Sequence, residues 1–316
     1  MATMLNQRAN DLVTAVLPRI GDLRGTLIEL EGGGCVIDLG VKAEGSLEAG
    51  RLLAEVCLAG LAEVRIVPGD VGGVAWPSVQ VVTDAPVEAC LLSQYAGWQI
   101  SVGKFFAMGS GPMRAAAARE EVFEKLGYRE SAGSVVGVLE TGKLPSAEVV
   151  AVIAEKTGVP TDRVTLLAAR TASLAGNLQV VARSVETSLH KLVELGFDVW
   201  RVRSAVGVAP LPPVAKDDFA GIGRTNDAIL YGGRVTLMVR GDDESIAAIG
   251  PQVPSCGSAA HGKPFAEIFE DAGRDFYKID PHLFSPAEVV FQNLDTGRVH
   301  VFGGITPDVL RRSFEF

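Results

Sequence analysis

The chain has 316 residues, of which 47% are hydrophobic, and a net charge of −9 from 29 Lys and Arg against 38 Asp and Glu. This acidic balance argues against a nucleic-acid partner, which requires a basic face. The N-terminus lacks the apolar core of a signal peptide, and no run reaches the roughly 18 apolar residues of a membrane span, so we expect a cytoplasmic protein without a membrane partner. Four widely spaced cysteines predict free thiols rather than a disulfide framework.

Local signals predict the elements of the N-terminal part of the chain. Apolar residues at helical spacing predict a helix over residues 4–18, which ends at Pro18. Residues 25–40 are expected to form a β-hairpin, because the glycines at 32–34 tolerate the positive φ of a tight turn. The further elements expected before residue 128 are helices over 46–60, 86–98 and 114–127, the last closed by Gly127, and strands over 62–69, 76–84 and 99–112.

The remaining sequence repeats the alternation of strands and helices. The proline-rich residues 206–223 predict a linker or crossover, and residues 227–241 predict a strand, a Gly-Gly turn and a second strand. Residues 288–304 predict a hairpin that turns at Asp295–Gly297. The other expected elements are strands over 134–142 and 163–170 and helices over 145–158, 177–196 and 264–273.

Hairpins and helices are therefore mixed along the chain. This mixture favours an α/β protein of the α+β layered kind, with mixed sheets, over a uniform series of βαβ units. The length allows two domains, and we place them at residues 1–130 and 131–316, with segments able to cross between them.

The stretch "FFAMGSGPMRAAAA", residues 105–118, places flexible and stiff residues side by side. Gly109 and Gly111 permit backbone angles closed to other residues, and Pro112 suits the first turn of a helix. The stretch predicts a strand, a tight turn and a helix start, which is either an ordinary connection or an anion site. A dinucleotide-binding loop is disfavoured because Arg114 stands where the third glycine of GxGxxG belongs.

Other common signatures are incomplete. "GSAAHGKP", residues 257–264, has the spacing of a nucleotide-binding loop, but Pro264 replaces the Ser or Thr that holds magnesium. Of the four histidines only His261 lies near another ligand type, Cys256, and no second pair completes a zinc site. No serine lies in a GxSxG motif.

One predicted helix carries polar groups beside its apolar face. Arg183, Glu186 and His190 form a strip next to the apolar residues of 178–192. Arg183 and Glu186 are three residues apart, so their side chains can meet. The spacing alone favours an ordinary surface ion pair over a functional site.

Four stretches together resemble the methenyltetrahydromethanopterin cyclohydrolase family, and the similarity spans nearly the whole chain. They are "GKFFAMGSGPMRA" (103–115), "ARSVETSLHKL" (182–192), "GRTNDAILYGG" (223–233) and "VPSCGSAAHGKPFAEIF" (253–269), with "FYKIDPHLFSPAEV" (276–289) as a fifth. The family occurs in methanogenic archaea and in bacteria that oxidise one-carbon compounds. The resemblance implies a two-domain homotrimer subunit with a pterin substrate in a cleft between its domains, and no metal or organic cofactor.

The resemblance also implies which residues form the site. Glu186 matches the family's catalytic glutamate, and Arg183 matches the arginine beside it. The matched segments imply a substrate pocket built from Lys104, Ser110, Gly111, Arg114, Asn226, Asp227, Tyr231 and Gly232. His261 and Lys263 are interpreted as parts of a structural turn.

The implied reaction is the reversible hydrolysis of a cyclic N5,N10-methenyl cation to the N5-formyl compound. A carboxylate such as Glu186 can deprotonate water and pass the proton to N10. A neighbouring Arg183 lowers the basicity of that carboxylate, whereas burial raises it. Two alternatives stay open: a non-catalytic pterin-binding protein of the same fold, and a cyclohydrolase that acts on a folate.

Overall fold

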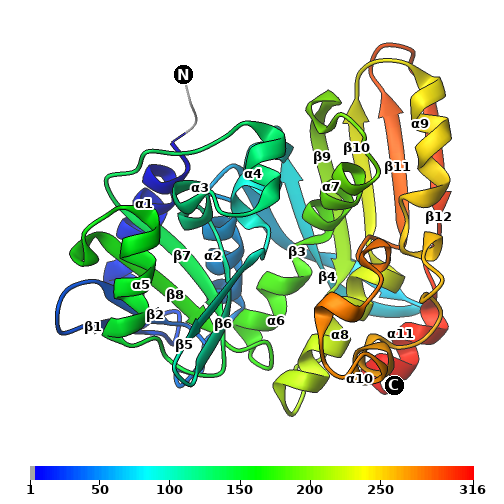
Figure 1. The fold of residues 1–316 in the computed structure, drawn as a ribbon. Coiled ribbons are helices and arrows are strands. Elements are labelled where there is room, and N and C mark those ends of the chain that lie inside the picture. Colours follow the sequence, from blue (N-terminus) through cyan, green and yellow to red (C-terminus); the bar gives the residue numbers. More distant parts are fainter. Residues whose placement is uncertain (1–3) are drawn as a thin grey trace. The chain divides into compact units, whose positions relative to one another are not determined.

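The computed structural model describes residues 4–316 (Figure 1). By its contacts the chain forms two compact units, each made of two segments. The first unit contains the chain up to Ala62 together with Glu88–Gln179, and the second contains Glu63–Val87 together with Val180–Phe316. The domain boundary expected at residue 130 stays a prediction, although the strands on either side of it, Phe105–Ser110 and Val135–Glu140, pair with each other.

The first unit contains a six-stranded sheet with the order β1-β2-β8-β7-β6-β5. The central strands β2, β8 and β7 are parallel, while β1, β6 and β5 join the sheet in antiparallel pairs. Its strands are β1 (Thr26–Glu29), β2 (Cys35–Asp38), β5 (Trp98–Val102), β6 (Phe105–Ser110), β7 (Val135–Glu140) and β8 (Val164–Ala169).

Helices pack on both faces of this sheet. The helices of the first segment are α1 (Leu5–Val16) and α2 (Leu47–Cys57), and those of the second are α3 (Met113–Ala117), α4 (Glu121–Leu126) and α5 (Ala147–Thr157). One apolar cluster joins α1 and α2 to alternate residues of β2, β7 and β8, and a second joins α3 and α5 to the intervening residues. The parallel strands are therefore buried on both sides, as is usual for such sheets.

The second unit contains a six-stranded sheet with the order β12-β11-β10-β9-β4-β3, in which β10 and β11 are parallel. Its strands are β3 (Ala62–Val71), β4 (Val74–Thr83), β9 (Val202–Pro210), β10 (Arg234–Val239), β11 (Glu288–Asn293) and β12 (Val299–Gly303). Its helices are α7 (Ser184–Glu194), α8 (Asp218–Gly232), α9 (Asp243–Ile249), α10 (Phe265–Asp271) and α11 (Pro307–Phe314), and α6 (Leu174–Val181) leads into it from the first unit. Together the two mixed sheets and their helices confirm the expected α+β class.

Three predicted elements are divided in the structure. Residues 98–110 form a hairpin of two strands rather than one strand, with Gly103 at φ +56° in the turn. The helix expected over 114–127 is broken at Ala118, which adopts a left-handed conformation and ends α3. The helix expected over 177–196 is interrupted between α6 and α7, where Arg183 has φ −93° and ψ 9°. The end of α4 at a left-handed Gly127 is confirmed.

The proline-rich linker and the strand at residue 227 were wrong predictions. Residues 206–210 belong to β9 and residues 218–232 to α8, so only residues 211–217 connect them. Asp217 caps α8 by accepting a hydrogen bond from the Ala220 amide, which starts the helix before the apolar run that suggested a strand. A buried apolar run of this length fits either element, and here the cap decides in favour of the helix.

Candidate functional site

The glycine-rich turn of the first unit connects β6 to α3 as its composition predicts. A Cβ at Gly109 would lie 2.9 Å from the ends of the Ile100 and Met113 side chains, so a larger residue there would force these neighbours to shift. Gly111 has φ +85°, and its amide donates to the Ser93 carbonyl at 2.9 Å. Because α3 has only five residues, it aligns few peptide dipoles, and the geometry gives little support to an anion site.

Arg114 follows this turn and is fully buried. Its Nε lies 2.6 Å from the Glu120 carboxylate, and its Nη1 donates to the carbonyls of Leu91 and Ser93 at 3.2 and 3.1 Å. The guanidinium also lies 5.0 Å from the ring centre of Tyr95. Arg114 thus connects a π-helix at Val87–Gln94 to the start of α4, and these contacts stabilise the first unit.

The other predicted residues of this unit differ in exposure. Ser110 is buried, and its Oγ lies 3.3 Å from both the Val138 carbonyl and Cys57 Sγ. Lys104 lies in the exposed turn between β5 and β6, where its carbonyl accepts a hydrogen bond from Lys143 Nζ. Of the residues predicted for the first unit, Lys104 is thus the one whose side chain is open to solvent.

Arg183 and Glu186 lie at the start of α7 in the second unit. Their exposed fractions are 7% and 4%, so both side chains are buried and the surface location that their spacing favoured is wrong. Arg183 is the N-cap residue, and Glu186 lies in the first helical turn, where the positive end of the helix dipole favours a carboxylate. Helix α7 packs closely on β9. Gly207 of β9 lies so near this helix that a Cβ added to it would come within 2.4 Å of Ser184 Oγ.

Lys191 is a buried charged residue of α7 that sequence reasoning missed. It is 1% exposed, and its Nζ donates to the His282 carbonyl. Burial lowers the pKa of Lys191 to about 8, opposed in part by the nearby Asp280 carboxylate. The one sign of this burial in the sequence was the position of Lys191 between the apolar residues Leu189 and Leu192, both of which are buried.

Asp227 and Tyr231 lie one turn apart on α8 and face the segment before α10. The carboxylate of Asp227 accepts a hydrogen bond from the Phe265 amide at 2.8 Å. Tyr231 donates from its hydroxyl to the Lys263 carbonyl at 2.5 Å and accepts from the Gly262 amide at 3.0 Å. Burial raises the pKa of Asp227 to about 7 and also raises the pKa of Tyr231. These two residues hold the segment that carries Lys263.

The remaining predicted residues of α8 have different surroundings. Asn226 is half-buried, and its Nδ2 donates to the Ile222 carbonyl one turn earlier. Gly232 ends the helix where a Cβ would lie 2.7 Å from Pro210, so its role in the structure is close packing. His261 stacks at a tilt on Tyr231, with ring centres 4.8 Å apart, and burial lowers the pKa of its imidazole. These contacts agree with the interpretation of His261 as part of a structural turn.

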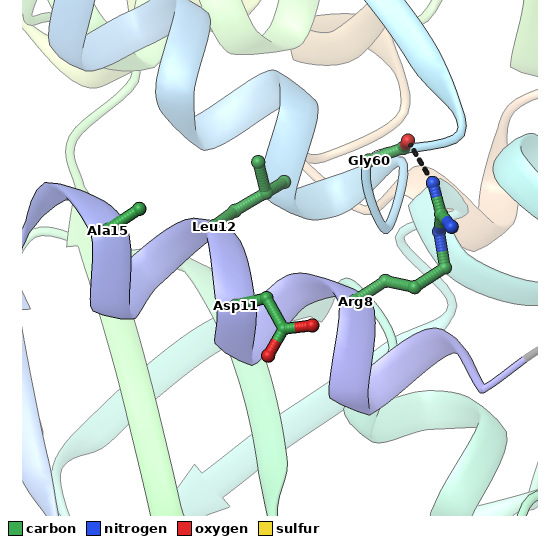
Figure 2. Close-up of a pocket in the computed structure, with 5 residues that line it drawn as sticks. All are labelled: Arg8, Asp11, Leu12, Ala15 and Gly60. Carbon is green, nitrogen blue, oxygen red and sulfur yellow. Dashed lines mark hydrogen bonds between the residues drawn. The ribbon is translucent and has the colours of Figure 1, made fainter.

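An open pocket of about 310 Å³ lies beside α1 in the first unit (Figure 2). Arg8, Asp11, Leu12, Ala15 and Gly60 line it. The Arg8 guanidinium is turned to the carbonyls of Ala59 and Gly60, at 3.1 and 2.7 Å. None of the predicted site residues lines this pocket.

Metal-binding clusters and membrane-spanning helices are both absent from residues 4–316. No group of three or more His, Cys, Asp or Glu side chains in this range is arranged to hold a metal ion. No helix within the same range is both long and apolar enough to cross a membrane. The expectation that the protein uses no metal or organic cofactor stays a prediction.

Comparison with known proteins covers almost the whole chain. Residues 4–314 match the family described as Cyclohydrolase (MCH). The chain is 48% identical over 316 residues to methenyltetrahydromethanopterin cyclohydrolase of Methylobacterium sp. (strain 4-46), covering 98% of this chain and 97% of that protein. It is 42% identical over 313 residues to the protein of the same name from Methanosarcina barkeri, covering 98% of both. The chain therefore belongs to the cyclohydrolase (MCH) family.

Proposed function

We propose that this protein reversibly hydrolyses N5,N10-methenyl-tetrahydromethanopterin to the N5-formyl compound in one-carbon metabolism. The observation that carries the proposal is the match over residues 4–314, together with relatives of that name at 42–48% identity in a methylotrophic bacterium and a methanogenic archaeon. We further propose a cytoplasmic homotrimer that needs no metal or organic cofactor and has no nucleic-acid partner.

The hydrolysis requires few catalytic groups besides a positioned carboxylate. The substrate carbon is already electrophilic, because its amidinium spreads one positive charge over two nitrogens. Glu186 takes a proton from the attacking water as the new carbon–oxygen bond forms. It then delivers that proton to N10 as the carbon–N10 bond breaks, and the remaining hydroxyl proton leaves to solvent as the formyl group forms. Such proton transfer is worth about 10²- to 10⁴-fold in rate.

Arg183 is proposed to hold Glu186 in its ionised form and in position. The burial of both side chains supports this division of roles, because a guanidinium stabilises a nearby carboxylate in surroundings that would otherwise favour protonation. The carboxylate in turn favours binding of the cationic substrate over the neutral product.

We propose that the other predicted residues bind or shape the pterin pocket. The exposed Lys104 and the half-buried Asn226 have polar side chains open to a ligand. The buried Ser110, Arg114, Asp227 and Tyr231 fix the backbone around them, and Gly111 and Gly232 provide close backbone approach.

The proposal is tested by adding purified protein to methenyl-tetrahydromethanopterin and to methenyl-tetrahydrofolate and following loss of the methenyl absorbance. We expect rapid loss with the methanopterin compound only. Binding without absorbance loss would instead identify a non-catalytic pterin-binding protein, and turnover restricted to the folate would identify the other alternative.

A further inference from the structure

The connections of the first sheet change sides between β7 and β8. The connection that leaves β7 runs through α5, whose Val149 and Ile153 lie in the apolar cluster that contains α3. The connection that leaves β8 runs through α6, whose Ala175 lies in the cluster of α1 and α2 on the other face. Open parallel sheets bind ligands outside the carboxyl ends of their strands, where successive connections turn to opposite faces. In this sheet that point lies after Glu140 and Ala169.

Polar contacts join the ends of β7 and β8 at this point. The half-buried Glu140 is the last residue of β7, and its carboxylate accepts a hydrogen bond from the hydroxyl of Thr171, which is 3% exposed. Thr141 donates from its amide to the Ala169 carbonyl at 3.0 Å and from its hydroxyl to the Phe106 carbonyl at 2.8 Å. These contacts hold the backbone and the carboxylate of Glu140 in place between β6 and β8.

An apolar shelf lies beside Glu140 on the same face of the sheet. Met108 of β6 is the register partner of Glu140, and Phe106 lies two residues before it, so all three side chains point to one face. Helices α1 and α2 cover this face farther along, over Val138 and Leu167. Phe106, in contrast, is 52% exposed, and Met108 is half-buried. We call Phe106 and Met108 the apolar shelf, which ends at the Glu140 carboxylate.

We propose that Glu140 and the apolar shelf bind the pterin ring of the substrate, an inference that rests on the proposed function. The flat ring stacks on Phe106 and contacts the Met108 thioether. Its pyrimidine edge carries two adjacent N–H donors, at N3 and at the 2-amino group, which match the two oxygens of one carboxylate. Thr171 is a positioning residue, because it orients that carboxylate. An anionic group of the substrate's tail would be repelled by Glu140, so the ring is the part that fits here.

The main test compares Glu140→Gln with Glu148→Gln. The second variant is the matched control, because it removes an exposed carboxylate from α5, which packs on the opposite face. Binding is measured by titration calorimetry with tetrahydromethanopterin, which lacks the one-carbon group and therefore cannot react. We expect Glu140→Gln to raise Kd by about 10-fold or more, because glutamine offers one acceptor oxygen where the carboxylate offers two. Glu148→Gln should keep the wild-type Kd.

A second variant tests the apolar shelf. Phe106→Ala removes the exposed ring and should raise Kd for tetrahydromethanopterin by about 5- to 10-fold through lost stacking. Trp200→Ala is its control, since Trp200 is 45% exposed in the second unit and should leave Kd unchanged. Thermal unfolding followed by circular dichroism checks that all variants fold.

Turnover of methenyl-tetrahydromethanopterin separates ring binding from a merely structural role. The N3 edge lies at the far end of the ring system from the reacting carbon, so its contacts are equal in substrate and transition state. Glu140→Gln should therefore raise KM and leave kcat nearly unchanged. Wild-type Kd in folded Glu140→Gln, or a wild type that does not bind tetrahydromethanopterin, would overturn the proposal. A wild type that binds it through Glu140 without hydrolysing the methenyl compound would support this site and contradict only the proposed activity.

Discussion

The two sheets differ in how much of their surface is buried. In the first unit the parallel strands β7 and β8 are buried at nearly every position, because helices cover both faces. In the second unit β10 and β11 alternate between buried and partly exposed residues, because one face alone is fully covered. The first sheet is therefore buried on both faces, while one face of the second sheet stays partly exposed.

The largest effect is expected from removing the buried charge of the first unit. Arg114→Met leaves Glu120 without its ion-pair partner and the carbonyls of Leu91 and Ser93 without their donor. We expect a loss of about 3–5 kcal/mol in the free energy of unfolding, measured with urea. Arg65→Met in the second unit removes an exposed ion pair with Glu63 and should cost less than about 1 kcal/mol. Equal losses would show that the buried network does not stabilise the first unit.

A core truncation in the first unit should follow closely. Leu167 of β8 is fully buried in the cluster that joins α1 and α2 to the sheet. Leu167→Ala is expected to lower the free energy of unfolding by about 2–5 kcal/mol, since helices on both sides prevent collapse around the cavity. A loss below about 1 kcal/mol in urea unfolding would mean that this core is more loosely packed than its burial indicates.

The second unit has a buried acid whose effect depends on pH. Burial raises the pKa of Asp227 to about 7, against 3.8 in an unfolded chain. Glu267 adds to this rise, while Arg312 and the hydrogen bond from the Phe265 amide oppose it. The folded state therefore holds a proton that the unfolded state releases, and stability is lost as the pH rises from about 4 through about 7.

Asp227→Asn should remove this dependence. Asparagine keeps an oxygen for the Phe265 amide and carries no charge, so the variant should gain stability relative to wild type as the pH rises, by up to about 4 kcal/mol at pH 8. Urea unfolding of both proteins at pH 5 and pH 8 measures the difference. Parallel pH profiles for the two proteins would contradict the raised pKa.

The smallest effect is expected at Val299 of β12, on the partly exposed face of the second sheet. Val299→Ala should change the free energy of unfolding by less than about 0.5 kcal/mol in dilute protein, because the side chain is 59% exposed. A loss above about 1 kcal/mol would contradict the description of the Val299 side chain as exposed.

Elements with strong local signals were predictable from the sequence. Pro18 predicted the end of the first helix, the three glycines at 32–34 predicted the hairpin at 25–40, and the Asp295–Gly297 turn predicted the hairpin at 288–304. All three elements are confirmed. The start of α8 was not predicted, because its apolar run suits strand and helix alike and the cap at Asp217 was decisive. The break between α6 and α7 was not predicted either, because no glycine or proline lies there.

The candidate site was predictable in its residue types more than in its contacts. The helical spacing of Arg183 and Glu186 left open whether they were buried, since that depends on how α7 packs on β9. The partners of Arg114 come from residues 91, 93 and 120, and those of Tyr231 from residues 262 and 263. Such long-range contacts arise from tertiary packing, which no local pattern encodes.

We propose that the Glu186 carboxylate performs the proton transfers of hydrolysis. The most direct measurement compares turnover of methenyl-tetrahydromethanopterin by wild type, Glu186→Gln and Glu194→Gln, the last changing an exposed glutamate on the same helix. We predict that Glu186→Gln lowers kcat by at least about 10²-fold while the protein stays folded, and that Glu194→Gln stays near the wild-type rate. Near-normal turnover by Glu186→Gln would contradict the assignment of Glu186 as the catalytic base.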